Sequence, residues 1–248
     1  MIKKGFPLLL LTLWASLSTA AEDQKAGWSG SSELGIIFTR GNTETTSAKG
    51  RVDLEQNLED WINEFSIDAL FKEDEVVDET TGEEETEKTA EKYFAYAKTN
   101  YKLKDDHSKL FAYLSHTDDQ FAGVAKNTTV AFGYGRRLVE TDNTYLDADI
   151  GPGYSFSEQA DGEDVEDFII RVSAKYHWKI SESATFIQKL SSEIGEENTR
   201  TLAESSLATK INSALQMKIG LVVTNNSDVP EETEKTDTET TVTLVYSF

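Results

Sequence analysis

The feature that most constrains this chain is a period-two alternation of apolar and polar residues that recurs along almost its whole length. From Trp28 to Phe38 every second residue is apolar or small, and similar patterns recur at 168–178 and 242–248. Alternation with period two is typical of β-strands whose two faces meet different environments. Twelve such segments can be counted, at 28–40, 44–58, 61–72, 91–103, 108–118, 127–138, 144–156, 166–179, 184–195, 200–211, 214–225 and 237–248.

The lengths of the segments and of their connections indicate how the strands are arranged. Each segment is long enough to cross a bilayer as a tilted strand. Short turns at 59–60, 104–107, 139–143, 180–183 and 212–213 alternate with longer loops at 73–90, 119–126, 157–165, 196–199 and 226–236, and with one tight turn at Gly41-Asn42. Short turns on one side and long loops on the other are typical of outer-membrane barrels. We therefore predict an all-β fold, a transmembrane antiparallel up-and-down barrel of about twelve strands over residues 28–248.

The N-terminus has the layout of an export signal. Lys3 and Lys4 precede an apolar stretch from Phe6 to Leu17, and small residues follow at 18–21. We predict a cleaved signal peptide at 1–21 and a short periplasmic lead at 22–27. The alternative is a membrane anchor, but the apolar stretch is shorter than a spanning helix needs. Together with the barrel pattern, the signal predicts a place in a Gram-negative outer membrane.

Composition excludes several classes of function. The net charge of −21 disfavours a nucleic-acid partner, because phosphate binding needs a basic surface. The chain has no Cys and three His, so we expect no disulfide, no metal and no cofactor. One acid and histidine cluster, at His116, Asp118 and Asp119, could activate a water for a hydrolase at the barrel rim. A histidine at a strand end beside solvated acids is the interpretation we favour.

Most of the negative charge lies in three segments predicted to face outward. The segment 73–91 has a net charge of −9, 157–167 has −6 and 226–239 has −5. Such loops repel anions and gather cations, which is compatible with divalent cations bound beside lipopolysaccharide, with a cation-leaning pore, or with a surface receptor or adhesin. The plainer alternative, which we favour, is a solvated acidic loop.

Charged residues of both signs alternate with the apolar residues and are therefore predicted to face the lumen. These candidate lumen charges are Glu33, Arg51, Asp53, Glu64, Asp68, Asp147, Asp149, Arg171, Lys175, Lys189 and Lys218. They are compatible with a polar channel and equally with a closed interior held by salt bridges. About twelve strands enclose a lumen between the small filled barrels and the open porins of 16–18 strands.

Aromatic residues gather at the ends of the predicted strands. One set lies at short turns (Trp28, Trp61, Tyr101, Tyr145, Trp178, Phe186, Phe248) and another near long loops (Phe38, Phe71, Phe94, Phe121, Phe156, Phe168). Two aromatic belts are typical of a barrel spanning two interfaces. The terminal alternation Val242, Leu244, Tyr246 and Phe248 is predicted to be the signal read by the barrel assembly machinery. Lipid, lipopolysaccharide and this machinery are the expected partners of a monomer.

One residue breaks the strand pattern. Pro152, within Gly151-Pro152-Gly153, cannot donate a ladder hydrogen bond. We predict a β-bulge or bend there, with a rim position above the hydrocarbon as the alternative.

With these residues described, the chain resembles the salt-induced outer-membrane protein family of the YdiY type. The resemblance covers about 27–248 and rests on Thr39-Arg40-Gly41-Asn42-Thr43, Phe132-Gly133-Tyr134-Gly135-Arg136, Gly151-Pro152-Gly153-Tyr154 and the strand ending at Phe248. It implies an outer-membrane barrel linked by name to salt and supplies no substrate or catalytic residue. The expected function is an envelope-stress barrel, either a narrow cation-leaning pore or a closed structural barrel.

Overall fold

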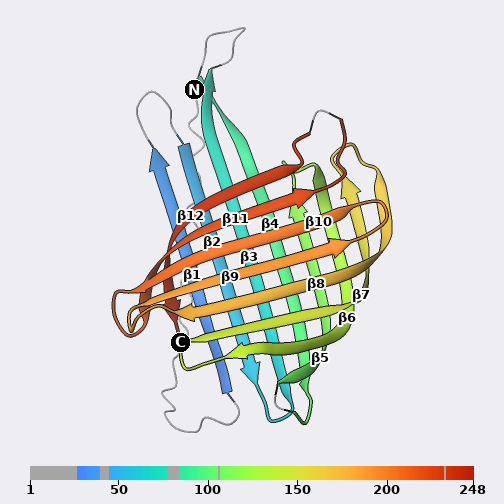
Figure 1. Cartoon of the computed structure of the whole chain (residues 1–248). Coiled ribbons are helices and arrows are strands. Elements are labelled where there is room, and N and C mark those ends of the chain that lie inside the picture. The colour runs from blue at the N-terminus through green and yellow to red at the C-terminus, as the bar shows by residue number, and fades with distance from the viewer. Residues whose placement is uncertain (1–26, 40–44, 78–83, 106, 232) are drawn as a thin grey trace.

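Twelve strands form one closed antiparallel barrel in the computed structural model, which describes residues 27–39, 45–77, 84–105, 107–231 and 233–248. Each strand pairs with its neighbours in the sequence, and β1 pairs with β12 to close the wall (Figure 1). The predicted fold class is confirmed. The predicted signal peptide, residues 22–26 of the predicted lead and the turn at Gly41-Asn42 lie outside the described residues.

The strand bounds follow the sequence pattern closely on the side of the short turns. The strands are β1 (Gly27–Thr39), β2 (Thr45–Asn57), β3 (Trp61–Val77), β4 (Glu84–Lys102), β5 (Ser108–Asp119), β6 (Val124–Glu140), β7 (Thr144–Gln159), β8 (Asp164–Lys179), β9 (Ala184–Ile194), β10 (Thr199–Lys210), β11 (Leu215–Asn226) and β12 (Thr236–Ser247). On the other side several strands are longer than predicted, and the predicted long loops shrink.

The loop predicted at 73–90 is largely wrong, because β3 continues to Val77 and β4 begins at Glu84. The predicted loops at 119–126 and 157–165 are the short connections 120–123 and 160–163. Gly162, with a φ of 86°, lies in the second of these. Beyond the apolar band both faces of a strand meet water, so the ladder continues without an alternating hydropathy signal.

The two faces of the barrel wall have opposite character. Large apolar side chains are exposed on the outer face, among them Leu34, Ile67 and Phe168. The side chains buried toward the interior are mostly polar, including Glu33, Thr129 and Arg171. An apolar exterior around a polar interior is the arrangement expected of a barrel in lipid. No helix in the described part of the chain is long and apolar enough to cross a membrane.

The aromatic belts form only in part. Trp61 and Tyr101 lie on adjacent strands at the short-turn end, with ring centroids 5.0 Å apart, and both are exposed. Two predicted belt residues instead face the lumen: Tyr145 stacks on His177 at 4.7 Å, and Phe94 lines an interior cavity. Tyr145 shares the strand face of Asp147 and Asp149, so its direction follows from strand alternation and not from its place at a strand end.

Of the β-bulge or bend predicted at Pro152, the β-bulge does not form. The β7–β8 ladder runs through Pro152 without a shift. In the β6–β7 ladder, Phe132 and Gly133 are not paired with Pro152 and Gly151, which lie opposite them. Pairing resumes in the same register at Tyr134 and Ile150. A Cβ atom on Gly133 would overlap the carbonyl oxygen of Ile150, and one on Gly151 would overlap that of Phe132. The facing glycines let the two strands approach closely where proline removes a donor.

We therefore expect Gly151→Ala to destabilise the barrel by about 1–3 kcal/mol, because the added methyl group has no room. Urea unfolding of the refolded protein, followed by heat-modifiable gel mobility, would measure the change. Gly50→Ala is the matched control, since its Cβ would meet only Leu34, at 3.9 Å. Equal unfolding midpoints for the two variants would contradict the close approach of β6 and β7.

Candidate functional site

The inner face of the barrel gathers charged side chains from almost every strand. The eleven predicted lumen charges lie on the strand faces opposite the exposed apolar residues: Glu33, Arg51, Asp53, Glu64, Asp68, Asp147, Asp149, Arg171, Lys175, Lys189 and Lys218. Most of these side chains belong to connected ion pairs. Their part in any passage of solute stays a prediction.

The first centre of this network is Glu204 on β10. Arg51 reaches it from β2 across the lumen, with Nη1 3.1 Å from Oε1. Lys189 lies 3.6 Å from Oε2, and Lys218 lies 3.9 Å from Oε1. Lys218 also pairs with Glu33 at 2.7 Å. One carboxylate is therefore shared by three cations and links β10 to β2, beyond β11, β12 and β1 in the wall.

The second centre is Asp149 on β7. Lys98 on β4 lies 2.5 Å from its Oδ2, and Lys109 on β5 lies 3.5 Å from its Oδ1. A Cβ atom on Gly135 would overlap Oδ1 of Asp149, so this glycine makes room for the carboxylate. Glycine is needed at position 135 because the Asp149 side chain, on the neighbouring strand β7, occupies the space that a Cβ atom would take.

Aromatic rings line the lumen between these centres. Tyr113 lies under the guanidinium of Arg171, which is 4.0 Å from the ring centroid, and Tyr96 lies 6.0 Å from Tyr113. Lys98 lies 5.3 Å from the centroid of Phe111. Cation–π contacts of this kind hold long basic side chains in fixed directions inside the lumen.

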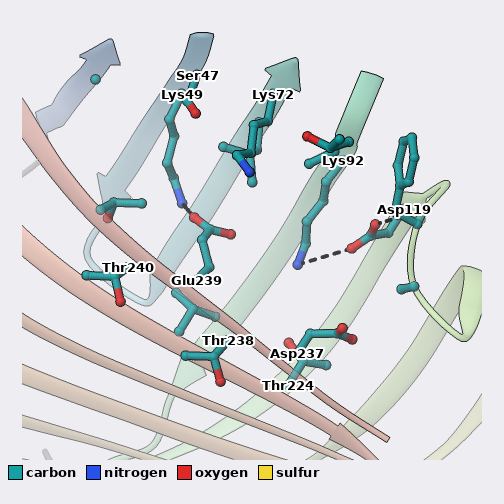
Figure 2. Close-up of a pocket in the computed structure, with 18 of the residues that line it drawn as sticks. Ser47, Lys49, Lys72, Lys92, Asp119, Thr224, Asp237, Thr238, Glu239 and Thr240 are labelled. Carbon is teal, nitrogen blue, oxygen red and sulfur yellow. Dashed lines mark hydrogen bonds and ion pairs between the residues drawn. The ribbon is translucent and has the colours of Figure 1, made fainter. Parts of the chain in front are cut away.

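Two cavities lie within the barrel. One, of about 200 Å³, lies among Arg51, Asp149, Arg171 and Glu204. The other, of about 470 Å³, lies beyond Lys49 toward the long-loop end (Figure 2). In Figure 2, Lys49 pairs with Glu239 and Lys92 pairs with Asp119 across its walls. Glu239, which we assigned to the outer acidic segment, therefore faces the interior and is neutralised there.

Polar atoms within the lumen are not all satisfied by protein. Buried atoms of Ser66 and Asn100 have no hydrogen-bond partner among the described residues. Those of Asp68, Asp149 and Arg171 have only ion-pair partners, at 3.5–3.6 Å. Such groups are costly unless water reaches them. Together with the two cavities, they indicate a hydrated interior in place of a dry packed core.

The acid and histidine cluster predicted at the rim does not converge on one site. His116 points away from the lumen and hydrogen-bonds Thr128 through Nδ1 at 2.8 Å. Asp119 points inward and pairs with Lys92 at 3.4 Å. Residues 116 and 119 alternate onto opposite faces of β5, and Asp118 shares the outer face with His116. Among the described residues, no group of three or more His, Cys, Asp or Glu side chains could hold a metal ion.

Several network residues were missed from the sequence. Glu204, and Glu193, which pairs with Arg171 at 3.6 Å, lie in strands with weak alternation. Lys98 is flanked by Ala97 and Thr99, which do not mark a lipid face. Lys49 is bordered by Ala48 and Gly50 and gives equally little signal. Only the register of β10 against β9 and β11 shows that Glu204 shares a level with Lys189.

We expect Glu204→Gln to destabilise the barrel more than Arg51→Gln does. The first change leaves Arg51, Lys189 and Lys218 without their shared carboxylate, and breaking a buried pair costs roughly 3–5 kcal/mol. The second leaves Glu204 with two lysines. Urea unfolding of both single variants and of the double variant would measure the order. An equal or larger loss in Arg51→Gln would show that Glu204 is not the centre of the network.

Comparison with known proteins agrees with this architecture. Residues 32–248 match the family described as "Protein of unknown function, DUF481". The Uncharacterized protein YdiY of Escherichia coli (strain K12) is 26% identical, over 95% of this chain and 94% of its own length.

Solved structures with a similar fold are outer-membrane barrels. The NanC porin has a TM-score of 0.50 and 11% identity, over 90% of this chain and 99% of its own. The COG4313 outer membrane channel from Pseudomonas putida F1 has a TM-score of 0.50 and 12% identity, over 92% of this chain and 97% of its own. Because the family match spans nearly the whole barrel, the chain belongs to the DUF481 family of proteins of unknown function, the YdiY-type group that its strand and glycine motifs resemble.

Proposed function

We propose that this protein is a narrow outer-membrane channel for small ions, with the ion-pair network as its constriction and an acidic outer mouth that favours cations. The observation that carries the proposal is a lumen lined by charges of both signs whose side chains leave two cavities unfilled. Similar folds in a porin and an outer-membrane channel support it.

The network sets the width of the path. The Arg51–Glu204 pair and the Arg171–Tyr113 contact both cross the lumen, from β2 to β10 and from β8 to β5. Opposite charges at the same depth in the lumen produce an electric field across the channel. Their side chains leave only narrow gaps through which hydrated ions can pass. Selectivity then depends on the mouth, where the segments 73–91 and 157–167 carry a large excess of acids.

A closed structural barrel is the second candidate. The same ion pairs favour it, because they link strands that are not neighbours in the wall and so stiffen the barrel. The two candidates differ in one measurable property, the passage of current.

Single-channel conductance of the refolded mature protein in a planar bilayer tests the proposal. We expect small steady steps in the wild type and larger steps in Arg51→Gln/Glu204→Gln, because this double change removes a cross-lumen tie without altering the net charge. A correctly folded barrel that stays silent in both forms would overturn the channel and favour the structural barrel.

The lumen cations provide a test of ion selectivity. A charge about 4 Å from a passing ion changes its energy by ~1 kcal/mol at the dielectric of water. Removing two lumen cations in Arg171→Gln/Lys175→Gln should therefore raise the permeability ratio of cation to anion several-fold, measured from the reversal potential in a salt gradient.

The matched control removes two cations from the outer face of β6. Lys126 and Arg136 are both exposed and lie on the side of the strand opposite the lumen. Lys126→Gln/Arg136→Gln makes the same charge change and should leave the reversal potential close to that of the wild type. An equal shift in both double variants would mean that Arg171 and Lys175 are not on the ion path.

A further inference from the structure

Two lysines lie directly opposite each other on the inner face of the barrel. Lys175 on β8 is the cross-strand partner of Lys189 on β9, and both side chains line the smaller cavity, of about 200 Å³. Like charges at directly opposed positions of a sheet repel each other and destabilise it. The stability of the barrel therefore does not explain why both positions carry a cation.

The strand on the other side of Lys175 does not neutralise it. Asp147 on β7 is its cross-strand partner there, but Arg137 holds that carboxylate through two hydrogen bonds, of 2.7 and 3.1 Å. Among the described residues no carboxylate lies within 4 Å of the Lys175 ammonium group, which is 6.0 Å from the centroid of the Tyr145 ring. Lys175 is thus a lumen cation without an ion pair.

Lys189 has only a share of one carboxylate. It lies 3.6 Å from Oε2 of Glu204, which is also the partner of Arg51 at 3.1 Å and of Lys218 at 3.9 Å. The two neighbouring ammonium groups therefore have between them one carboxylate that two other cations also use.

The part of the cavity wall formed by β8 and β9 contains hydrogen-bond donors and no acid. Its polar side chains, which we call the donor wall, are Arg171, Ser173, Lys175, Lys189 and Ser191. Arg171 is buried, and its Nε has no hydrogen-bond partner among the described residues, only Glu193 at 3.6 Å. Ser173 accepts a hydrogen bond from Arg171 and donates one to Asp149. The two lysines and Ser191 remain available to a ligand.

The acids that line the same cavity come from other strands and are already engaged. Four of them pair with a lysine or an arginine: Asp68, Asp149, Glu204 and Glu239. The fifth, Glu64, accepts a hydrogen bond from Asn100 at 2.9 Å. An anion in the cavity therefore meets uncompensated positive charge at the donor wall, and it meets carboxylates mainly where cations already neutralise them.

A second part of the cavity wall, formed by β4 and β5, is aromatic. Tyr96 lies between Phe94 and Tyr113, with ring centroids 5.9 and 6.0 Å away. Tyr113 in turn lies under the guanidinium of Arg171, which is 4.0 Å from its centroid, so the aromatic rings begin where the donor wall ends. Aromatic faces pack well against a flat ligand body.

We propose that the smaller cavity binds a small organic anion, a carboxylate carried on a single ring. The carboxylate lies between Lys175 and Lys189, where its two oxygens accept hydrogen bonds from both ammonium groups and from Ser191. The ring lies against Tyr96. A cavity of about 200 Å³ is smaller than the pockets of ~300–1,000 Å³ that hold drug-sized ligands, which limits the body of the ligand to about one ring.

This site goes beyond the proposed channel. Binding requires only that a small solute reaches the cavity from one end of the lumen, whereas conduction requires a path through the whole barrel. The two can therefore be tested separately, and a silent barrel can still bind the anion.

Titration calorimetry of the refolded mature barrel in micelles of a nonionic detergent tests the site. The probes are benzoate and glucuronate, which carry a carboxylate on an aromatic and on a hydroxylated ring, so the tighter of the two identifies the ring. We expect the neutral molecules benzamide and glucose to bind about tenfold more weakly or worse, because they bring no charge to the two lysines.

Three variants locate the site. Lys175→Gln/Lys189→Gln should weaken binding of the carboxylate by about tenfold or more, because hydrogen bonds to charged groups are lost. Lys175→Arg/Lys189→Arg keeps both charges and should retain most of the affinity. Lys126→Gln/Arg136→Gln makes the same charge change as the first variant on the outer face of β6 and should bind as the wild type does.

Urea unfolding separates a binding role of the lysines from a structural one. Lys175→Gln breaks no ion pair and removes a repulsion, so we expect its unfolding midpoint to equal or exceed that of the wild type. If the double glutamine variant does not fold, Lys175→Gln alone provides the binding test, with a loss of several-fold in affinity as the expected result.

Three outcomes would overturn the site. The first is a folded barrel that binds neither benzoate nor glucuronate, or that binds benzamide or glucose as tightly as its charged counterpart. The second is unchanged affinity after the two lysines, or Lys175 alone, are replaced by glutamine. The third is inorganic phosphate binding as tightly as the better carboxylate, which would show a general anion site that does not use the aromatic wall.

Discussion

The satisfaction of backbone hydrogen bonds in lipid is the constraint on which the rest of this structure depends. A strand that crosses hydrocarbon must pair on both edges, and only closure of the sheet achieves that for every strand. Closure brings β1 against β12, although their residues are far apart in the sequence. It also forces one face of every strand inward, so the charges that cannot face lipid are collected in the lumen.

The lumen network follows from that enforced proximity. Charges of both signs at similar depth pair across the barrel, as Arg51 does with Glu204, and neutralise each other where isolated charges would be costly. The pairs are arranged around two carboxylates, Glu204 and Asp149, each shared by lysines from separate strands. This arrangement stiffens the wall and also narrows any path through the lumen. The two candidate functions, a channel and a structural barrel, therefore rest on the same contacts and differ only in whether ions pass.

Glycine and proline mark the places where the wall departs from regularity. Gly133 and Gly151 permit close approach beside Pro152, Gly135 makes room for Asp149, and Gly35 marks the end of β1–β12 pairing. Gly133, Gly135, Gly151 and Pro152 belong to motifs that carry the family resemblance, and their role in the wall is conformational. The wall is therefore tightest between β6 and β7 and loosest between β1 and β12.

The sequence by itself determined the class of fold, the number of strands, the lipid-facing side of the strongly alternating strands and eleven of the lumen charges, because period-two alternation records which face meets lipid. It misjudged strand length beyond the apolar band, where both faces meet water and alternation disappears although the β3–β4 ladder continues. Only the tertiary structure decided which charges meet, since Arg51 and Glu204 are neighbours through barrel closure and not through spacing. It alone also decided that Glu239 pairs with Lys49 and that the β1–β12 ladder ends at Leu34, because these depend on pairing between strands, which no single strand encodes.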